Sequence, residues 1–502
     1  MFAQQGKRVF RSVVLLWCAA LTTCSQPKTI TILHTNDMHA SYIPHQATWR
    51  RESPKPMVGG FQELEFTVDS IRKVKPNVLL LDAGDVMTGN PITDRVYKGA
   101  EGGALFEMMN MIGYDAWCLG NHDFDISQEN LRALTTIARF PTLSANVVNT
   151  KNEFPLHNKD YIIVERGGVK IGIIGIMTQQ LYGLVFQDNL VGIKVLSPIE
   201  TVQKIIDRID GETDLIIALT HQGVDDDSTM AAQVHGLDII VGGHSHTRLT
   251  KPKIVNDVII VQTGSRCENL GELEVTVEND KVAKYDGKLI PLWPNDSHPR
   301  TRLAEFADSL QKEINKEYDE VIAQLTVDWK KDGRAESNLG QFLADAQREA
   351  AHAQVGFMNG GGIRANAAAG PLTKRALFEI LPFRNILTTF QLSGKELKDV
   401  VLKSVNGEEA IILSGITAKL QRHPDGSVSV VSMSVDGKPV NEKRMYVCAA
   451  SDFFVGQAKR YIGVEIPQPV YLKQTVFQAV EGVVRKAKVI ATKSERRIEI
   501  VQ

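Results

Sequence analysis

The chain has 502 residues, of which 43% are hydrophobic and 23% are charged. This length predicts two substantial domains, and the apolar fraction is ordinary for a soluble globular protein. The formal net charge is −2, which argues against a protein that is basic overall, and nothing in the composition indicates a nucleic-acid surface or a polybasic membrane patch, so any anion binding must be local.

Residues 1–24 have the build of a signal peptide. Lys7, Arg8 and Arg11 precede an apolar stretch, residues 13–21, that is too short to span a bilayer. Cys24 stands where a bacterial lipoprotein is cleaved and acylated, although Thr23 is an unusual residue before such a cut. We expect an exported protein of the periplasm or cell envelope, and lipid anchoring at Cys24 and simple release are the two open alternatives. A buried N-terminal helix is the less favoured interpretation.

From residue 28 onward, short aliphatic and β-branched runs recur, at residues 29–34, 78–81, 116–119, 171–176, 215–219, 238–241 and 258–262. Continuous apolar runs of this length are typical of strands that are covered on both faces. Helical spacing of apolar residues lies between some of them, at 61–73 and 199–209. The pattern predicts an α/β sandwich with helices outside the sheets.

Side chains that can bind a metal follow five of these strands. They stand in Asn36-Asp37-Met38-His39, Asp82-Ala83-Gly84-Asp85, Gly120-Asn121-His122-Asp123, Thr220-His221-Gln222-Gly223 and Gly242-Gly243-His244-Ser245-His246. Ligands of α/β proteins bind beyond the carboxyl ends of the strands. A single Asp-x-His motif is mostly a turn with a surface histidine. Five strands that each end in a metal-binding side chain, however, predict a shared site.

The predicted ligands are carboxylates, imidazoles and an amide, without a thiolate, which suits Mn, Zn, Fe or a similar divalent ion. Their number exceeds the need of one ion and fits two ions that share a bridging carboxylate. Two cations about 3.5–4 Å apart clamp both oxygens of an in-line displacement at phosphorus, and they lower the pKa of a bound water from about 15.7 toward 7.

These motifs resemble the signature of calcineurin-like metallophosphoesterases, and residues 32–39 and 120–125 are similar to the 5'-nucleotidase family. The resemblance implies a four-layer α/β/β/α metallophosphoesterase sandwich over residues 28–290. It also implies a linker and interdomain helix over residues 291–320, and a smaller α/β substrate-binding domain over residues 321–502.

The same resemblance implies roles for single residues. One ion would be held by Asp37, His39, Asp85 and His246, and the other by Asp85, Asn121, His221 and His244, with Asp85 bridging. His122 would face the substrate phosphate, and Asp125 would orient His122. The alternative for Asp125 is a helix N-terminal cap. Gln222, next to His221, is a candidate for supporting that ligand and has no assigned role.

In the second half, Pro291-Leu292-Trp293-Pro294-Asn295-Asp296 predicts a linker. Apolar residues at helical spacing then predict an amphipathic helix over residues 302–320. The family has an interdomain helix here, with a hinge near it that lets the domains rotate. The alternative is a helix that packs rigidly on one domain.

A predicted strand at residues 355–358 ends in Asn359-Gly360-Gly361-Gly362-Ile363-Arg364. Three glycines permit close approach of the backbone to a flat or anionic ligand, and Arg364 can pair bidentately with phosphate or carboxylate. By the resemblance, Asn359 and Arg364 contact the nucleotide, Phe383 stacks on its base, and Arg334 is a second arginine. For Phe383, a place in the core is the alternative.

One segment departs from the family. Relatives carry Gly-Gly-Asp-Gly and an aromatic residue near the C-terminus, whereas this chain has residues 451–461 without that motif. The second aromatic residue of the base clamp is therefore open, with Phe454 and Tyr461 as candidates.

The sequence as a whole predicts an exported enzyme with two divalent metal ions that hydrolyses nucleoside 5'-monophosphates and has no nucleic-acid partner. A UDP-sugar hydrolase, a 2',3'-cyclic nucleotide phosphodiesterase with 3'-nucleotidase activity, a thiosulfohydrolase-like enzyme and a non-catalytic surface lipoprotein are the alternatives.

Overall fold

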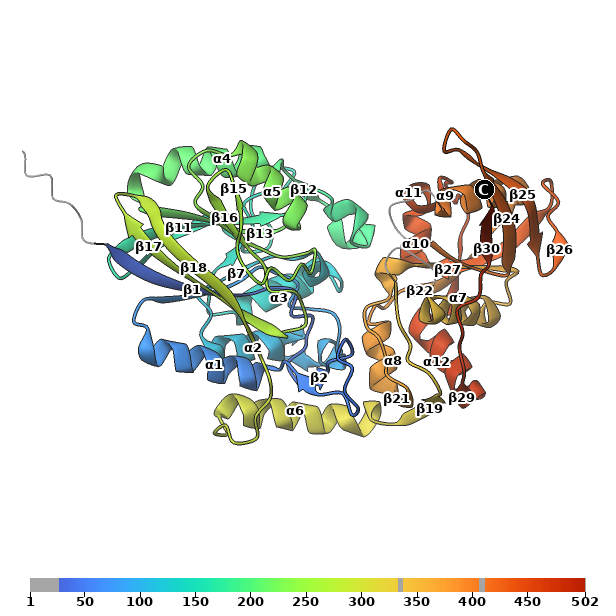
Figure 1. Cartoon of the computed structure of the whole chain (residues 1–502), viewed down its shortest axis with the longest axis horizontal. Coiled ribbons are helices and arrows are strands. Elements are labelled where there is room, and N and C mark those ends of the chain that lie inside the picture. Colours follow the sequence, from blue (N-terminus) through green and yellow to red (C-terminus); the bar gives the residue numbers. More distant parts are fainter. Residues whose placement is uncertain (1–26, 333–336, 406–410, 502) are drawn as a thin grey trace, which may run out of the picture.

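The computed structural model describes residues 27–332, 337–405 and 411–501. Figure 1 shows two domains side by side, with the long helix α6 (Arg302–Tyr318) running below the first domain toward the second. The predicted signal peptide with Cys24, and also Arg334, lie outside the described residues.

Two six-stranded sheets form the N-terminal domain. The first has the order β18-β17-β1-β4-β7-β8, formed by β1 (Lys28–Thr35), β4 (Val78–Asp82), β7 (Ala116–Cys118), β8 (Thr142–Leu143), β17 (Asn269–Glu278) and β18 (Lys281–Pro291). The second has the order β10-β11-β13-β14-β16-β15, formed by β10 (Tyr161–Arg166), β11 (Val169–Met177), β13 (Leu215–His221), β14 (Ile239–Gly242), β15 (Lys253–Val255) and β16 (Val258–Val261). Within each sheet four neighbouring strands are parallel, so their carboxyl ends meet at one edge.

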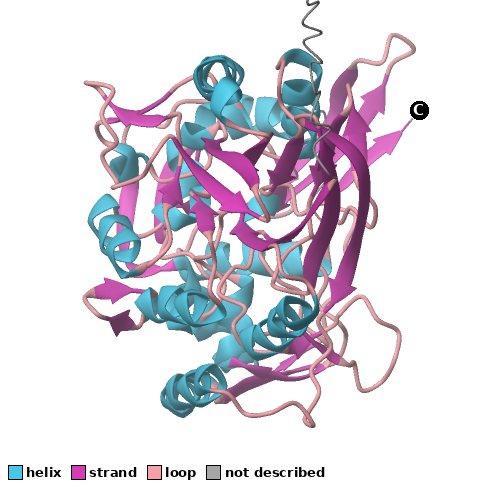
Figure 2. Cartoon of the chain, turned by 90° about the vertical axis from the view of Figure 1, so that its left-hand side faces the viewer, coloured by secondary structure: helices cyan, strands magenta, loops and turns pink. Residues whose placement is uncertain are grey.

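Helices cover the outer face of each sheet, and in the turned view of Figure 2 they lie above and below the strands. The first sheet packs against α1 (Phe61–Val74), α2 (Gly103–Ile112) and α3 (Gln128–Ile137), and the second against α4 (Pro198–Ile209) and α5 (Val224–Gln233). Alternate strand residues, such as Ile30 and Ile32, face the opposite sheet in a separate core. Both faces of the central strands are therefore buried, which explains their continuous apolar runs and confirms the four-layer sandwich.

Helix α6 begins at its predicted first residue, with the Thr301 side chain accepting from the Ala304 N–H at 3.2 Å. Its buried residues Leu303, Ala307 and Ile314 belong to the core of the N-terminal domain. At its far end the Tyr318 ring lies 5.6 Å from the ring of Phe378 in the second domain. Most of the buried face of the helix is thus packed on the N-terminal domain, and its last turn contacts the C-terminal domain.

The C-terminal domain is built on a five-stranded sheet in the order β23-β20-β27-β22-β28, formed by β20 (Val355–Asn359), β22 (Ile386–Ser393), β23 (Ile411–Ser414), β27 (Met445–Ser451) and β28 (Val470–Thr475). One core cluster joins it to α7 (Asn338–Ala350), α8 (Lys374–Ile380) and α12 (Val476–Ala487). A second cluster joins it to α9 (Gly394–Ser404), α10 (Asp452–Gly456), α11 (Ala458–Ile462), β24 (Ile416–Arg422) and β25 (Val428–Val435).

Smaller elements complete the chain. The remaining strands are β2 (His45–Gln46), β3 (Met57–Val58), β5 (Val96–Tyr97), β6 (Ala100–Glu101), β9 (Val147–Asn149), β12 (Ile193–Val195), β19 (Val321–Leu325), β21 (Gly370–Thr373), β26 (Lys438–Pro439), β29 (Val489–Ile490) and β30 (Ile498–Val501). The single-turn helices are η1 (Pro91–Asp94), η2 (Asn121–Phe124), η3 (Leu181–Gly183), η4 (Gln187–Leu190), η5 (Asp210–Glu212) and η6 (Gly360–Gly362). Of the helices in the described ranges, none is long and apolar enough to cross a membrane.

Candidate metal centre

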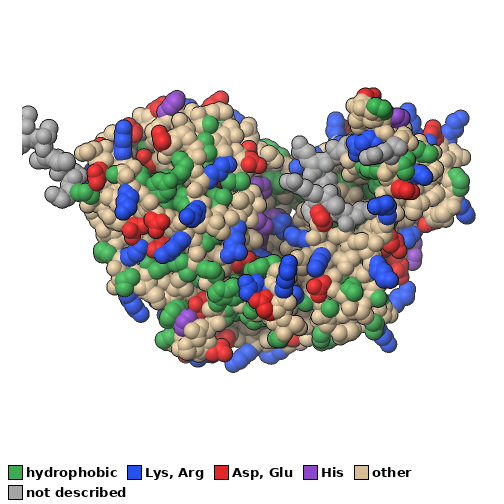
Figure 3. Space-filling model, viewed as in Figure 1, with side chains coloured by type: hydrophobic (Ala, Val, Ile, Leu, Met, Phe, Trp, Pro, Cys, Tyr) green, Lys and Arg blue, Asp and Glu red, His purple; other side chains and the backbone are tan. Residues whose placement is uncertain are grey.

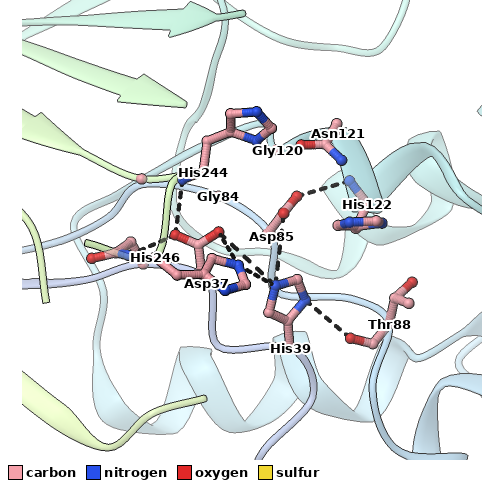
Figure 4. Close-up of polar contacts among 12 residues, drawn as sticks. Asp37, His39, Gly84, Asp85, Thr88, Gly120, Asn121, His122, His244 and His246 are labelled. Carbon is pink, nitrogen blue, oxygen red and sulfur yellow. Dashed lines mark hydrogen bonds and ion pairs between the residues drawn. The ribbon is translucent and has the colours of Figure 1, made fainter. Parts of the chain in front are cut away.

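The loops after β1, β4, β7, β13 and β14 meet at one edge of the two sheets, as the sequence predicts. Figure 4 shows side chains from four of these loops pointing toward one another. Backbone hydrogen bonds join the first two loops, from the Asp37 N–H to the Gly84 carbonyl (2.8 Å) and from the His39 N–H to the Asp85 carbonyl (2.9 Å). The ligand-bearing loops are therefore fixed to one another through their backbones.

One cluster of ligand atoms consists of Asp37, His39 and His246, whose atoms all lie within 4.8 Å of one another. The His246 Nε2 is 3.2 Å from the Asp37 Oδ1 and 3.0 Å from the His39 Nε2. The side chains come from two different strand ends, and Asp37 and His39 are buried.

A second cluster consists of Asp85, His221 and His244, again within 4.8 Å. The His221 Nε2 lies 3.2 Å from the Asp85 Oδ2 and 3.2 Å from the Asn121 Oδ1. The same Asp85 oxygen is 3.9 Å from the His39 Nε2 of the first cluster. Asp85 therefore stands between the two clusters, where a bridging carboxylate belongs.

Backbone carbonyls fix which nitrogen of two imidazoles carries the proton. The His221 Nδ1 lies 2.7 Å from the Ala83 carbonyl, and the His39 Nδ1 lies 3.1 Å from the Thr88 carbonyl. A carbonyl only accepts, so each Nδ1 donates to it, and Nε2 is the ring nitrogen that faces the site.

The donor set fits two divalent cations. The buried Asp37 Oδ1 makes no well-formed hydrogen bond within the described residues, and it faces the imidazole nitrogens His246 Nε2 (3.2 Å) and His39 Nε2 (3.9 Å). A buried carboxylate oxygen needs a partner, and a cation between these atoms would supply one. The Nε2 atoms of His39 and His246 converge on the same space. Carboxylate oxygens and neutral imidazoles are the ligands that borderline divalent ions take.

Charges around the site favour ligation. Burial would raise the pKa of Asp85, but His221, His122 and His39 hold it well below its usual range. Burial would lower the pKa of His221, but Asp85 raises it to about 10. Burial, helped by His221, lowers the pKa of His244 to about 3, so this imidazole is neutral. The clusters thus offer ionised carboxylates that attract positive charge.

The backbone of the site is strained. Asp37, His39, Asp85, His244 and His246 all have positive φ angles, between 47° and 77°. A left-handed conformation costs a residue with a side chain about 1–2 kcal/mol, and such residues cluster at functional sites. The fold therefore holds the ligands in place against their local preference.

Two glycines let the loops touch. A Cβ at Gly84, where φ is +92°, would lie 2.7 Å from the Gly120 nitrogen and 2.8 Å from the His221 Nδ1. A Cβ at Gly120 would lie 2.2 Å from the Asp85 nitrogen. Only glycine at both positions permits the observed approach of the ligands.

His122 lies beside both clusters, and its backbone N–H donates to the Asp85 Oδ1 at 2.8 Å. Its Nδ1 lies 2.8 Å from the Asp125 Oδ2, which also accepts from the Thr88 hydroxyl at 2.6 Å. Burial opposes the imidazolium, but Asp125 and Asp85 raise the pKa of His122. Asp125 does not cap the following helix, because the Ser127 side chain accepts from the Asn130 N–H there.

Two organising residues were missed by the sequence reasoning. Asp123 accepts from four backbone N–H groups, those of Gly120 (2.8 Å), Asp85 (3.2 Å), Val86 (3.1 Å) and Met87 (3.1 Å). It thereby ties the loop after β4 to the loop after β7. The only signal for it was its place in Gly-Asn-His-Asp.

The second organising residue is Gln262. Its amide donates to the Gly243 carbonyl (2.9 Å) and accepts from the Ser245 hydroxyl (2.9 Å), which supports the loop of His244 and His246. Gln222, in contrast, donates to the Asp227 carboxylate at 3.0 Å, in the core beside α5.

The two clusters of candidate ligand atoms, called the metal clusters below, face a cavity of about 700 Å³ between the domains. Figure 3 shows the hollow between the domains, with histidine side chains at it. Asp85, Asn121, His122, His244 and His246 line it from the N-terminal domain, and Asn359, Arg364 and Phe383 line it from the C-terminal domain.

Arg364 and Phe383 reach the metal clusters from the other domain. The Arg364 Nη2 lies 3.1 Å from the His39 Nε2, and its guanidinium carbon lies 5.9 Å from the centre of the Phe383 ring. The Phe383 ring lies 5.4 Å from the His122 ring. Because Phe383 lines the cavity and is only partly buried, the core alternative for it does not hold.

The two candidates for the second aromatic residue of the base clamp, Phe454 and Tyr461, differ in their surroundings. Phe454 is buried and stacks on Phe357 (5.5 Å) and Tyr461 (5.3 Å), so it belongs to the core and the expectation for it is wrong. Helix α10 begins directly after Ser451, and its helical turn directs Phe453 toward the cavity and Phe454 inward. Tyr461 and Phe453 both line the cavity.

Comparison with known proteins agrees with this geometry. Residues 30–248 match the calcineurin-like phosphoesterase family, and residues 321–463 match the 5'-nucleotidase C-terminal domain. The chain is 31% identical to the 5'-nucleotidase of Bos taurus over 456 residues, which cover 80% of this chain and 75% of that one.

Two further relatives are similar. The trifunctional nucleotide phosphoesterase protein YfkN of Bacillus subtilis is 28% identical over 436 residues, 76% of this chain and 28% of that one, so this chain spans under a third of its length. The structure of a 5'-nucleotidase precursor from Thermus thermophilus has a TM-score of 0.84 and 28% identity, and covers 94% of this chain and 99% of that one. The chain therefore belongs to the 5'-nucleotidase family of metal-dependent phosphoester hydrolases.

Proposed function

We propose that this enzyme hydrolyses nucleoside 5'-monophosphates to a nucleoside and phosphate, outside the cytoplasm. One juxtaposition carries the proposal: His122 lies between the metal clusters and Phe383, with ring centres 5.4 Å apart, in a cavity that Arg364 also lines. Groups suited to a phosphate and a group suited to a base thus stand within the reach of one nucleotide.

The proposed ligand sets are Asp37, His39, Asp85 and His246 for one cation, and Asp85, Asn121, His221 and His244 for the other. The two measured clusters and the place of Asp85 between them support this division. The bound cations would supply Lewis acidity and activate water for attack at phosphorus. Residues 28–290 would hold the metals and residues 321–502 the substrate.

His122 would stabilise the charge that develops on the phosphoryl oxygens. Its Nδ1 proton is held by Asp125 at 2.8 Å, so its Nε2 is free to donate to a non-bridging oxygen. Asp125 thereby acts as a positioning residue and favours the imidazolium form.

The C-terminal domain would bind the rest of the nucleotide. Arg364, whose guanidinium already reaches the metal clusters, would pair with phosphate oxygens. Asn359 ends β20 at the cavity wall, where it would contact the nucleotide. Phe383 would stack on one face of the base.

Contacts between the domains would enclose the phosphate. Arg384, next to Phe383, pairs with Asp94 at 2.8 Å and with Glu101. On the other side of the site, Arg266 pairs with Glu379 at 3.0 Å. These ion pairs would hold the substrate-binding residues of the C-terminal domain close to the metal clusters of the N-terminal domain.

A substrate panel tests the proposal. Purified protein is stripped with a chelator and given Mn²⁺, Zn²⁺ or Mg²⁺, and phosphate release is followed for nucleoside 5'-monophosphates, a nucleotide sugar and a 2',3'-cyclic nucleotide. We expect metal-dependent release, fastest from the monophosphates. Failure to cleave any phosphoester with any of these ions would contradict the proposal and favour a binding protein.

Export is proposed from residues 1–24 alone. Cell fractionation should find the protein outside the cytoplasm with those residues removed, and mass spectrometry of its N-terminus decides between acylation at Cys24 and simple cleavage. Full-length protein in the cytoplasm would contradict export.

A further inference from the structure

A segment of the N-terminal domain, residues 181–190, lies against the C-terminal domain. Leu181, Val185 and Leu190 are buried in the core of their own domain. The Asn189 side chain donates to the carbonyls of Phe124 (2.9 Å) and Asp125 (3.0 Å), shortly after His122. The segment is therefore fixed in relation to the candidate catalytic histidine.

Phe186 stands out in this segment. It follows the buried Val185, yet 40% of its surface is exposed, and it lines the 700 Å³ cavity. The neighbouring anchors already attach the segment to the core, so local folding does not require an aromatic ring at this position. The ring instead forms part of the cavity wall.

Aromatic residues of the other domain line this cavity as well. Phe383, Phe453 and Tyr461 line the same cavity. Two hydrogen bonds cross the domain boundary beside them, from the Arg460 Nη1 to the Gly183 carbonyl (3.0 Å) and from the Gln457 amide to the Tyr182 carbonyl (3.1 Å). These bonds hold the segment of Phe186 against the start of α11.

The cavity thus differs in chemistry along its wall. Carboxylates, imidazoles and the Arg364 guanidinium line it at the metal clusters, whereas Leu184, Phe186 and Phe453 provide apolar wall from both domains. A nucleotide has the same division, with an anionic phosphate and a planar base whose faces stack on aromatic rings.

We propose that Phe186 is a specificity-determining residue that contacts the base of the substrate. The inference rests on the proposed nucleotidase function and extends it, because it assigns part of the base site to the metal-bearing domain. A base held there touches both domains at once, so base recognition requires the two domains to be together.

The test compares a substrate with a base and one without. Full-length protein, stripped and reloaded with Mn²⁺, is assayed for kcat and KM with adenosine 5'-monophosphate and with ribose 5-phosphate. Phe186→Ala should raise KM for the nucleotide about 5- to 100-fold, the range of one lost base stack. It should change kcat/KM for ribose 5-phosphate by less than about twofold, and Phe186→Tyr should restore nucleotide binding.

Tyr182→Ala is the matched control. Tyr182 belongs to the same segment and has the same exposed fraction, 40%, but its side chain is not among those that line the cavity. Wild-type kinetics in Phe186→Ala, an equal loss with both substrates, or an equal loss in Tyr182→Ala would each overturn the inference. A wild-type chain that is inactive on every phosphoester would instead refute the proposed function beneath it.

Discussion

Replacing Asp123 with asparagine tests how the two central loops are held together. The Asp123 Oδ1 accepts from the N–H groups of Val86 and Met87, and its Oδ2 accepts from those of Gly120 and Asp85. An asparagine of the same shape keeps one oxygen, so two buried N–H groups would face an amide NH₂. Each unsatisfied buried donor costs about 1–3 kcal/mol, which gives a loss of about 2–6 kcal/mol.

The loss should appear in two measurements. Thermal unfolding followed by circular dichroism should show a lower melting temperature for the chelated protein. Chelator competition should show metal binding weakened about 10- to 100-fold, as for other residues that support metal ligands, because the Asp85 backbone loses its anchor. Asp69→Asn, at an exposed position of α1, is the control and should behave like the wild type. A wild-type melting temperature and metal affinity for Asp123→Asn would refute the reasoning.

Three further substitutions probe catalysis, substrate binding and stability. His122→Asn should lower kcat about 100-fold or more and leave the metal content unchanged, because it removes a donor to the developing phosphoryl charge; unchanged turnover in steady-state kinetics would remove the role. Phe383→Ala should raise KM for nucleotides about 5- to 100-fold and spare ribose 5-phosphate, and equal effects on the two substrates would contradict base stacking. Asp238→Asn concerns stability: burial raises the pKa of Asp238 from 3.8 to about 6, so its protonated form is favoured in the folded state and stability falls as the pH rises between these two values. The difference corresponds to at most about 3 kcal/mol, and about 1–2 after allowance for its partial exposure. The amide can still accept from the Ile216 N–H, which now donates to the Asp238 Oδ2 at 2.8 Å. Urea unfolding should therefore show Asp238→Asn stabilised at about pH 8 and nearly unchanged at about pH 4, and equal effects at the two pH values would contradict the assignment.

The sequence predicted the layered fold and the meeting of the strand ends because both are encoded locally. An apolar run followed at once by Asp37, Asp85 or His221 carries its structural meaning within a few residues. Gly84 and Gly120 stand in these motifs, but the close approach that requires glycine there became visible only in the structure.

Features that depend on partners distant in the sequence could not be predicted. Asp123 binds N–H groups of a loop more than thirty residues earlier, and Gln262 supports the loop that follows β14. The sequence offered Phe454 and Tyr461 as candidates for the base clamp, and it did not show that α10 begins at Asp452 and turns Phe454 into the core. Leu292, in the predicted linker, is fully buried, and its carbonyl accepts from Gly59 at 2.8 Å.

The lining of the cavity could not be predicted from the sequence, because it depends on how the two domains are placed relative to each other. Phe186 lies in a segment without a recognisable motif, and only the contacts of Arg460 and Gln457 across the boundary bring it to the aromatic wall. The helix α6 illustrates the same limit, because its apolar stripe predicted a helix but not which domain it would cover.

Metal stoichiometry is the most direct test of the central claim, that side chains from five loops bind two cations sharing Asp85. Chelated protein dialysed against Mn²⁺ or Zn²⁺ should bind two equivalents per chain by elemental analysis, and Asp85→Asn should lose both. A wild-type chain that takes up at most one equivalent, or an Asp85→Asn variant that retains two, would contradict the shared dimetal centre.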